Sequence, residues 1–166
     1  MAENIQDAPL ANGADTEPTI GLITQYVKDL SFENPNAPDV YQWQDQPNID
    51  VQFNIGTAKV EEDLHEVVLK ITVKATAKAG TAFAVDLEYG ALFAMRNVSD
   101  EQAHPFLFAE APRLVFPFAR RVLADTVRDG GFAPLLLEPI DFGGLYLQQA
   151  QAAAAEAAVG EPVGNA

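Results

Sequence analysis

Four stretches in the first hundred residues predict β-strands. Three of them alternate hydrophobic and polar side chains with a period of two, which is the pattern of a strand that buries one face. These three stretches are residues 49–55, 67–78 and 83–93. A fourth strand is expected within residues 20–32, ahead of a loop in which Pro35 and Pro38 fix an irregular crossing. An antiparallel sheet with one face open to water is the simplest arrangement of these strands.

The second and third alternating stretches predict a long hairpin, with the turn at Ala79 and Gly80 between them. On the polar face of this hairpin we expect Lys74 and Lys78 to lie near Asp86 and Glu88. Opposite charges on neighbouring strands attract, so this pairing would support the hairpin.

From Ser99 onward the pattern becomes helical. Residues 99–102 resemble a capping box, and we expect the pair at 104–105, a histidine and a proline, to interrupt any helix that starts there. Further helices are predicted at about 112–128 and 142–159. The stripe of the first of these that would face the sheet consists of Val115, Phe118, Ala119, Val122 and Thr126. Pro117 costs ~3 kcal/mol in a helix interior, so it is expected in the first turn or at a kink.

These elements predict one domain of the α+β class, a four-stranded antiparallel sheet with helices packed on one side. The chain has 166 residues, enough for one core that buries roughly 70% of the unfolded surface. We expect the domain to span residues 19–159. Residues 1–18 and 160–166 hold few apolar side chains and are expected to form disordered tails, the first of them acidic.

The charge of the chain is strongly negative, with 24 acids against 10 bases and a formal net charge of −14. Residues 1–54 contain Lys28 as their only base. An acidic protein repels phosphate backbones and anionic lipids, so we expect no nucleic-acid partner and no direct membrane insertion. Basic proteins and basic chain segments are the favoured partners, although the same charge would also serve a solvated surface that is merely kept soluble.

Few side chains suit catalysis or metal binding. The chain has no cysteine, and its two histidines, His65 and His104, lie far apart in the sequence. Residues 61–63 are all acidic but lack the spaced oxygen ligands and the glycine of a calcium loop. The glycine pairs at 130–131 and 143–144 lack the preceding strand and the neighbouring Lys and Ser or Thr of a phosphate-binding loop. We therefore expect no enzyme activity, no cofactor and no metal site.

The amino terminus has no basic segment followed by an apolar one, and no apolar run approaches the ~18 residues of a membrane span. A cytoplasmic location is the resulting expectation.

The carboxyl-terminal third carries more apolar surface than its own packing requires. Residues 130–141 form a predicted loop with an exposed set of large side chains, namely Phe132, Leu135, Leu136, Leu137 and Ile140. Because loops run over the surface, these side chains must contact something else. The pattern indicates a protein that buries apolar surface against another copy of itself or against a client chain.

Three motifs resemble one known family. Residues 26–38, with the sequence YVKDLSFENPNAP, closely resemble the amino-terminal signature of SecB, the bacterial export chaperone. The motif FPFAR at 116–120 is a second match. The third is FAP at 132–134, followed by Leu137, Pro139, Asp141, Phe142 and Tyr146. The resemblance covers about residues 20–148.

This resemblance implies a SecB-like fold and a homotetramer built as a dimer of dimers. It further implies a chaperone that binds unfolded precursor proteins without ATP, keeps them competent for translocation and delivers them to the motor ATPase SecA.

The resemblance also assigns residues to three surfaces. Positions that face SecA correspond to Asp29, Glu33, Ala84 and Asp86. Ala84 stands where the family often has a larger aliphatic side chain, so that contact would depend mainly on charge. Positions at the oligomer interface correspond to Val85, Leu87, Tyr89, Phe118 and Val122. Client-binding positions correspond to Tyr41, Trp43, Phe132, Leu135 and Leu137.

Two other readings of the residues remain open. One is a small apolar-ligand carrier, or an enzyme on an α+β sheet, in which aromatic and aliphatic side chains line an enclosed pocket. The other is a homo-oligomer whose apolar surface is wholly buried by assembly.

Overall fold

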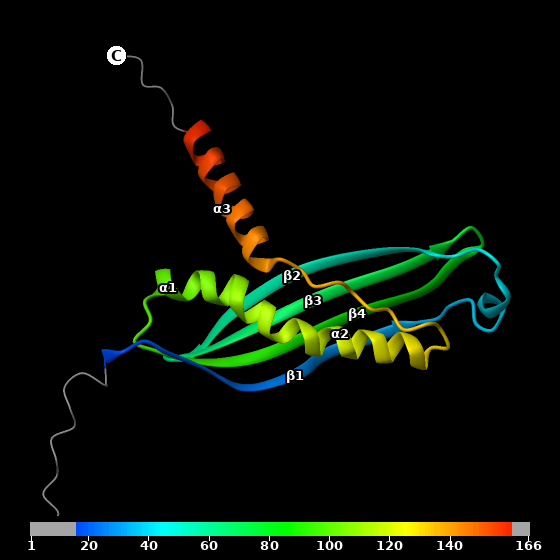
Figure 1. Ribbon diagram of the computed structural model, residues 1–166, viewed down its shortest axis with the longest axis horizontal. Helices are drawn as coiled ribbons and strands as arrows, with labels where there is room; N and C mark the ends of the chain where they lie inside the picture. The colour runs from blue at the N-terminus through cyan, green and yellow to red at the C-terminus, as the bar shows by residue number, and fades with distance from the viewer. Residues whose placement is uncertain (1–15, 161–166) are drawn as a thin grey trace, which may run out of the picture.

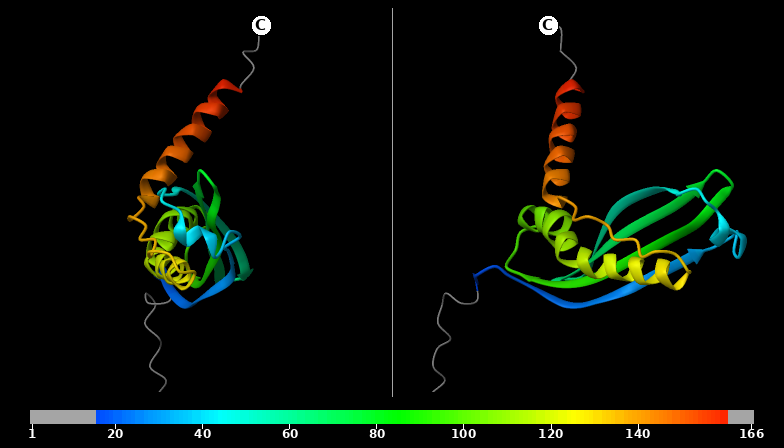
Figure 2. Two further views of the ribbon diagram at one scale, coloured as in Figure 1. Left: turned by 90° about the vertical axis from the view of Figure 1, so that its right-hand side faces the viewer. Right: turned by 45° about the vertical axis from the view of Figure 1, so that its right-hand side comes forward.

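The computed structural model describes residues 16–160 as two layers, an antiparallel sheet and a set of helices on one of its faces (Figures 1 and 2). The strands are β1 (Thr19–Glu33), β2 (Asn48–Glu61), β3 (Leu64–Ala77) and β4 (Gly80–Arg96), in the order β1-β4-β3-β2. The helices are η2 (Asp39–Gln42), α1 (Asp100–Pro105), η3 (Phe106–Glu110), α2 (Ala111–Asp129) and α3 (Phe142–Val159). This arrangement is the predicted α+β fold.

The core lies between the sheet and α2. Inward side chains of β3 and β4 are fully buried, as the period of two predicts: Val67, Leu69, Ile71, Val73, Val85 and Leu87. The opposing residues of α2 recur every three or four positions, and Val115, Ala119, Leu123 and Val127 are likewise fully buried. Each buried side chain of this size contributes on the order of 2 kcal/mol to stability.

The buried stripe of α2 differs from the predicted one. Val115 and Ala119 face the sheet as expected, but Phe118 is 46% exposed and Val122 is only partly buried. Leu123 and Val127 take the core positions instead, because the buried stripe follows a spacing of four residues from Val115, which leaves Phe118 on the flank of the helix.

The pairing predicted within the β3–β4 hairpin is wrong. Lys74 lies opposite Ala84, and Lys70 is the residue opposite Glu88, with 3.7 Å between Lys70 Nζ and Glu88 Oε1. The turn comes at residues 78–79, and the pairing of the two strands has a register irregularity just before it, between Ala75 and Thr76. Such an irregularity shifts every later cross-strand pair and leaves no mark in the alternation of the sequence.

The capping box at Ser99 is confirmed, since its side chain accepts from the Gln102 amide at 3.2 Å. The expected interruption at residues 104–105 is wrong, because the helical path continues through Pro105. Pro105 removes one backbone donor. The next five residues form a single π-helical segment, η3, in which Ala111 N–H donates to Phe106 O, and the chain then enters α2 without a break. Pro117 lies inside α2 and not in its first turn, and the alternative of a kink there stays a prediction.

Helix α3 begins where Asp141 caps it, accepting from the Gly144 amide at 3.0 Å. Phe142 is 2% exposed and anchors its first turn to the core. The alanine-rich remainder is exposed and projects away from the sheet (Figures 1 and 2).

The predicted domain limits coincide with the first strand and the last helix, which begin at Thr19 and end at Val159. The division into one domain and two tails stays a prediction, because the expected tails at 1–18 and 160–166 lie almost entirely outside the described residues.

Candidate functional site

The face of the sheet opposite the helices carries a group of carboxylates on two neighbouring strands. Asp29 of β1 is paired with Glu88 of β4, and Ser31 with Asp86, so both strands point their acids to the same side. Glu33 follows in the same register, opposite Ala84. We call Asp29, Glu33, Asp86 and Glu88 the acidic face. The residues assigned to SecA contact are three of these acids together with Ala84, and the strand register brings them together. Their role remains a prediction.

The carboxylates of the acidic face differ in their partners. Asp86 accepts a hydrogen bond from Thr72 Oγ1 at 2.9 Å, and Glu88 pairs with Lys70. Within residues 16–160, no ion pair involves Asp29 or Glu33, and both are exposed. Ala84 beside them offers only a methyl group. The surface therefore attracts cations through unpaired charge, and salt would screen that attraction.

A second surface lies at the end of the sheet where the crossing loop, the β3–β4 turn and the end of α2 meet (Figure 1). A hollow of about 300 Å³ opens there, lined by Val40, Tyr41, Trp43, Asp45, Pro47, Ala77, Ala82, Gly131, Phe132 and Ala133. We call this hollow the end groove. It contains three of the five residues assigned to client binding: Tyr41, Trp43 and Phe132.

Two aromatic rings of the end groove, those of Tyr41 and Phe132, are held in place by contacts with neighbouring residues. Tyr41 Oη donates to Gly130 O at 2.7 Å and accepts from Asn34 Nδ2 at 2.8 Å. Phe132 packs at a tilt against two other rings, with centroids 4.8 Å from Phe83 and 5.6 Å from Tyr41. The groove is therefore preformed, since its apolar surfaces need no further ordering to receive a ligand.

Leu135 and Leu137 do not line the end groove. Both pack partly against the core, and the backbone oxygen of Leu137 accepts from Arg120 at 3.2 Å. The expectation that the whole set from Phe132 to Ile140 is exposed is wrong, because only Leu136 is, at 75%. Leu136 lies beside Pro134 and the arginines of α2. In a loop without periodicity, no sequence signal distinguishes Leu136 from its two neighbours.

The residues assigned to the oligomer interface fall into two groups. Val85, Leu87 and Tyr89 are buried beneath the helices within one chain. Burial raises the pKa of Tyr89, and nearby Arg121 opposes that rise. Phe118 and Val122 lie on the outer flank of α2, where Phe118 is largely open. Their role in assembly stays a prediction.

Sequence reasoning missed an apolar row on the edge strand. β1 pairs only with β4, so its other edge is free within the part of the chain that the structure describes. Large side chains along it are at least 40% exposed: Ile20, Leu22, Ile23, Val27 and Leu30. A free strand edge with apolar side chains is a surface for pairing with another chain.

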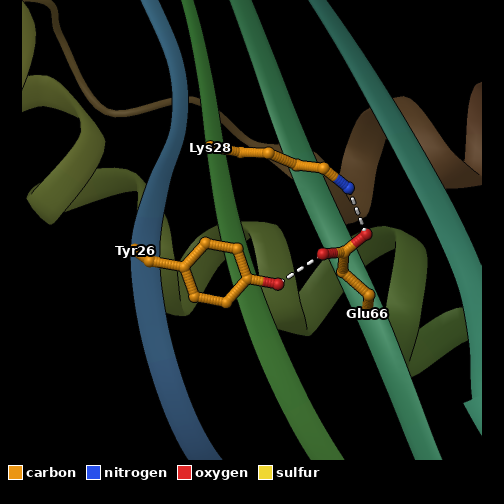
Figure 3. Close-up of polar contacts among 3 residues, drawn as sticks. All are labelled: Tyr26, Lys28 and Glu66. Carbon is orange, nitrogen blue, oxygen red and sulfur yellow. Dashed lines mark hydrogen bonds and ion pairs between the residues drawn. The ribbon is translucent and has the colours of Figure 1, made fainter.

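A polar cluster that sequence reasoning also missed joins β1 to β3 across β4 (Figure 3). Tyr26 Oη donates to one oxygen of Glu66, and Lys28 Nζ lies 2.7 Å from the other. Burial, the hydrogen bond to Glu66 and the charge of Glu66 raise the pKa of Tyr26 to about 12. The hydrogen bonds from Lys28 and Tyr26 lower the pKa of Glu66.

At residues 16–160 there is no group of three or more His, Cys, Asp or Glu side chains that could hold a metal ion. No helix in this described range is long and apolar enough to cross a membrane.

Comparison with known proteins places this geometry in a family. The family model described as preprotein translocase subunit SecB matches residues 13–153. The protein-export protein SecB of Novosphingobium aromaticivorans is 59% identical over 95% of this chain and 93% of its own length. That of Sphingopyxis alaskensis is 62% identical over 93% of this chain and 91% of its own.

Among solved structures, a SecB-like chaperone of Mycobacterium tuberculosis, in complex with an antitoxin peptide, has a TM-score of 0.62 and 16% identity. The match covers 73% of this chain and 90% of that one, and it concerns the fold. The fold is that of a SecB-like chaperone. The chain belongs to the SecB family of protein-export proteins.

Proposed function

We propose that this chain is an ATP-independent chaperone that binds unfolded precursor proteins, keeps them competent for translocation and delivers them to the SecA motor ATPase. Membership of the SecB family supports this proposal. The observation that carries it is the presence of two separate surfaces of opposite chemistry, the acidic face on the outer side of the sheet and the end groove at its end.

The end groove is the proposed client site. Tyr41, Trp43 and Phe132 offer aromatic surface, which extended chains bury at roughly 25 cal/mol per Å² without a fixed geometry. Recognition would therefore be broad. Leu136, in the loop that follows α2, adds exposed apolar surface beside Pro134 and the arginines of α2. Leu135 and Leu137 would act from behind, by supporting this loop against the core.

The acidic face is the proposed docking site for SecA. Asp29 and Glu33 are exposed and have no ion-pair partner in the described range, so a basic segment of the motor would neutralise them at low desolvation cost. Asp86 lies on the adjacent strand within the same patch. Ala84 contributes little apolar area, so charge supplies most of the attraction.

Assembly into a homotetramer, as a dimer of dimers, is the third part of the proposal. The free edge of β1 offers backbone donors and acceptors, and its exposed apolar row would be covered by a second copy. Phe118 and Val122 would extend this contact along α2. Val85, Leu87 and Tyr89 would act indirectly, by supporting the face on which α2 rests. Several grooves on one particle would bind one long client together and raise its affinity.

A small-ligand carrier is the rival. Two binding titrations separate the candidates, one with a long unfolded polypeptide and one with a fatty acid. The chaperone proposal predicts saturable binding of the polypeptide and suppression of its aggregation, without added ATP. Saturable binding of the fatty acid, with no effect on aggregation or refolding of the polypeptide, would overturn the proposal.

A further inference from the structure

The cluster of Tyr26, Lys28 and Glu66 ties the edge strand to a strand two places away. Both oxygens of Glu66 are engaged, one by Tyr26 and one by Lys28 (Figure 3). The side chain of Glu66 is 17% exposed and that of Lys28 is 45% exposed, so the carboxylate is partly shielded from water. A charged hydrogen-bonded group that is partly buried holds its partners more firmly than an exposed ion pair does.

The strand between them is shaped to let this contact form. Gly90 of β4 is buried and lies opposite Tyr26, whose ring passes over it. A Cβ atom at Gly90 would be 2.5 Å from Tyr26 Cε2, closer than any real contact. Only glycine therefore allows the ring to reach across β4 to Glu66. An aromatic side chain that covers a glycine on the adjacent strand also fixes the pairing register.

Register is the weak point of β1. Its pairing with β4 is irregular between Leu22 and Thr24 and again between Val27 and Asp29, so Lys28 is an extra residue without a direct partner. A slip of one residue turns every side chain of a strand to the opposite face. Such a slip past the second bulge would turn Asp29 and Glu33 toward the helices.

The cluster also determines where the positive charge of Lys28 lies. Lys28 is the only base of β1 and directly precedes Asp29. Its ammonium group reaches across the sheet to Glu66 instead of neutralising the acidic face. Loss of Glu66 would free this positive charge beside Asp29, where it would repel a basic partner.

We propose that Tyr26 and Glu66 are positioning residues for docking on the acidic face: they hold β1 in register beyond its second bulge and keep Lys28 away from Asp29. The inference rests on the proposed function, because docking of a basic SecA segment is what the two residues would serve. Neither side chain belongs to the acidic face itself.

The ionisation of the cluster agrees with a permanent contact. The pKa of Glu66 is lowered and that of Tyr26 is raised to about 12, so near neutral pH the carboxylate is charged and the phenol keeps the proton that it donates.

The test measures binding of SecA to the full chain and to four variants. Glu66→Gln should weaken binding about tenfold, because it frees Lys28 as well as Tyr26. Adding Lys28→Gln to it restores the original net charge of the pair, and the double variant should recover to within about threefold of the parent. Tyr26→Phe removes only a hydrogen bond and should cost about threefold. Glu62→Gln removes the same charge at the exposed β2–β3 turn and should change binding less than about twofold.

Hydrogen exchange supplies a readout that does not depend on SecA. The backbone amides of residues 29–33 should exchange faster in Tyr26→Phe and Glu66→Gln, while those of β3 keep their rates. The inference is overturned if these amides exchange as in the parent, or if Glu66→Gln binds SecA no worse than Glu62→Gln. Failure of the proposed function would look different, because the unmodified chain would then fail to bind SecA while the exchange result still decides the role of the cluster.

Discussion

The acidic face and the end groove are built on the same sheet, yet they differ in how their side chains are held. Asp29 and Glu33 stand in water and make no ion pair with any described residue. Tyr41 and Phe132 are fixed from behind by hydrogen bonds and by neighbouring rings. A partner of the first surface is therefore attracted by charge that salt screens, and a partner of the second by apolar area that salt does not weaken. The two surfaces should be separable by mutation.

The largest expected effect comes from charge reversal on the acidic face. Asp29→Lys combined with Asp86→Lys should weaken SecA binding by at least about 100-fold, because two attractions become repulsions. Client affinity should stay within about twofold, since the end groove keeps its lining. Calorimetric titration of both partners measures this. Glu61→Lys combined with Glu62→Lys, at the exposed β2–β3 turn, is the matched control. An equal loss with that control, or joint loss of both partners, would refute separate surfaces.

The next prediction concerns the support of the end groove. A methyl group at Gly130 would overlap the ring of Phe32, whereas one at Gly143 would lie in ordinary contact with Asp141 Oδ1, at 3.6 Å. Gly130→Ala should therefore destabilise the fold by about 1–3 kcal/mol. Gly143→Ala, a matched control at the start of α3, should leave stability equal or slightly higher. Urea denaturation compares them, and equal midpoints would show that the contact at Phe32 relaxes without cost.

Truncation of the groove lining should have a smaller effect. Phe132→Ala removes the ring that packs against Tyr41 and Phe83, and client affinity should fall about tenfold with no change in SecA binding. The loss should be the same at low and high salt. Val159→Ala, at the exposed end of α3, provides the control for removal of apolar surface. A client affinity that is insensitive to Phe132→Ala would place the client site elsewhere.

The smallest expected effect concerns the ionisation of Tyr26. Because the pKa of Tyr26 is about 12 instead of 10.0, its proton is bound more tightly in the folded chain than in the unfolded one. The stability that this contact provides is complete below pH 10 and is lost as the pH rises through 12. Ultraviolet absorbance of the parent minus Tyr26→Phe should show one tyrosine that ionises near pH 12. A difference curve centred at pH 10 would mean that the cluster is open in solution.

Much of the fold was predictable because the strands and helices have clean periods. The alternation in β3 and β4 predicted which side chains are buried, and Ser99 predicted the start of α1. The errors came from non-local geometry. The irregularity near Thr76 displaced the pairing of Lys74, and the π-helical η3 carried the chain past Pro105. Neither leaves a local pattern in the sequence.

The candidate site was likewise predictable from the sequence only in part. The resemblance to SecB assigned Asp29, Glu33 and Asp86 to one surface, and the strand register places them on one face of the sheet. The contact between Tyr26 and Glu66 spans forty residues, and it depends on Gly90 of the intervening strand. No spacing rule within one strand could predict it. Leu136 was expected to be exposed together with four neighbours, and sequence could not single it out because exposure inside an irregular loop depends on tertiary packing alone.

Formation of a ternary complex tests the central claim most directly. The chain is first saturated with an unfolded precursor labelled with a fluorophore, and SecA is then added while the label's anisotropy and the mass of the complex are followed. Two separate surfaces predict that SecA binds the loaded chain at least as tightly as the empty one, and that the precursor stays bound at first contact. Displacement of the precursor in proportion to the SecA bound would contradict the account, because it would mean that both partners use one surface.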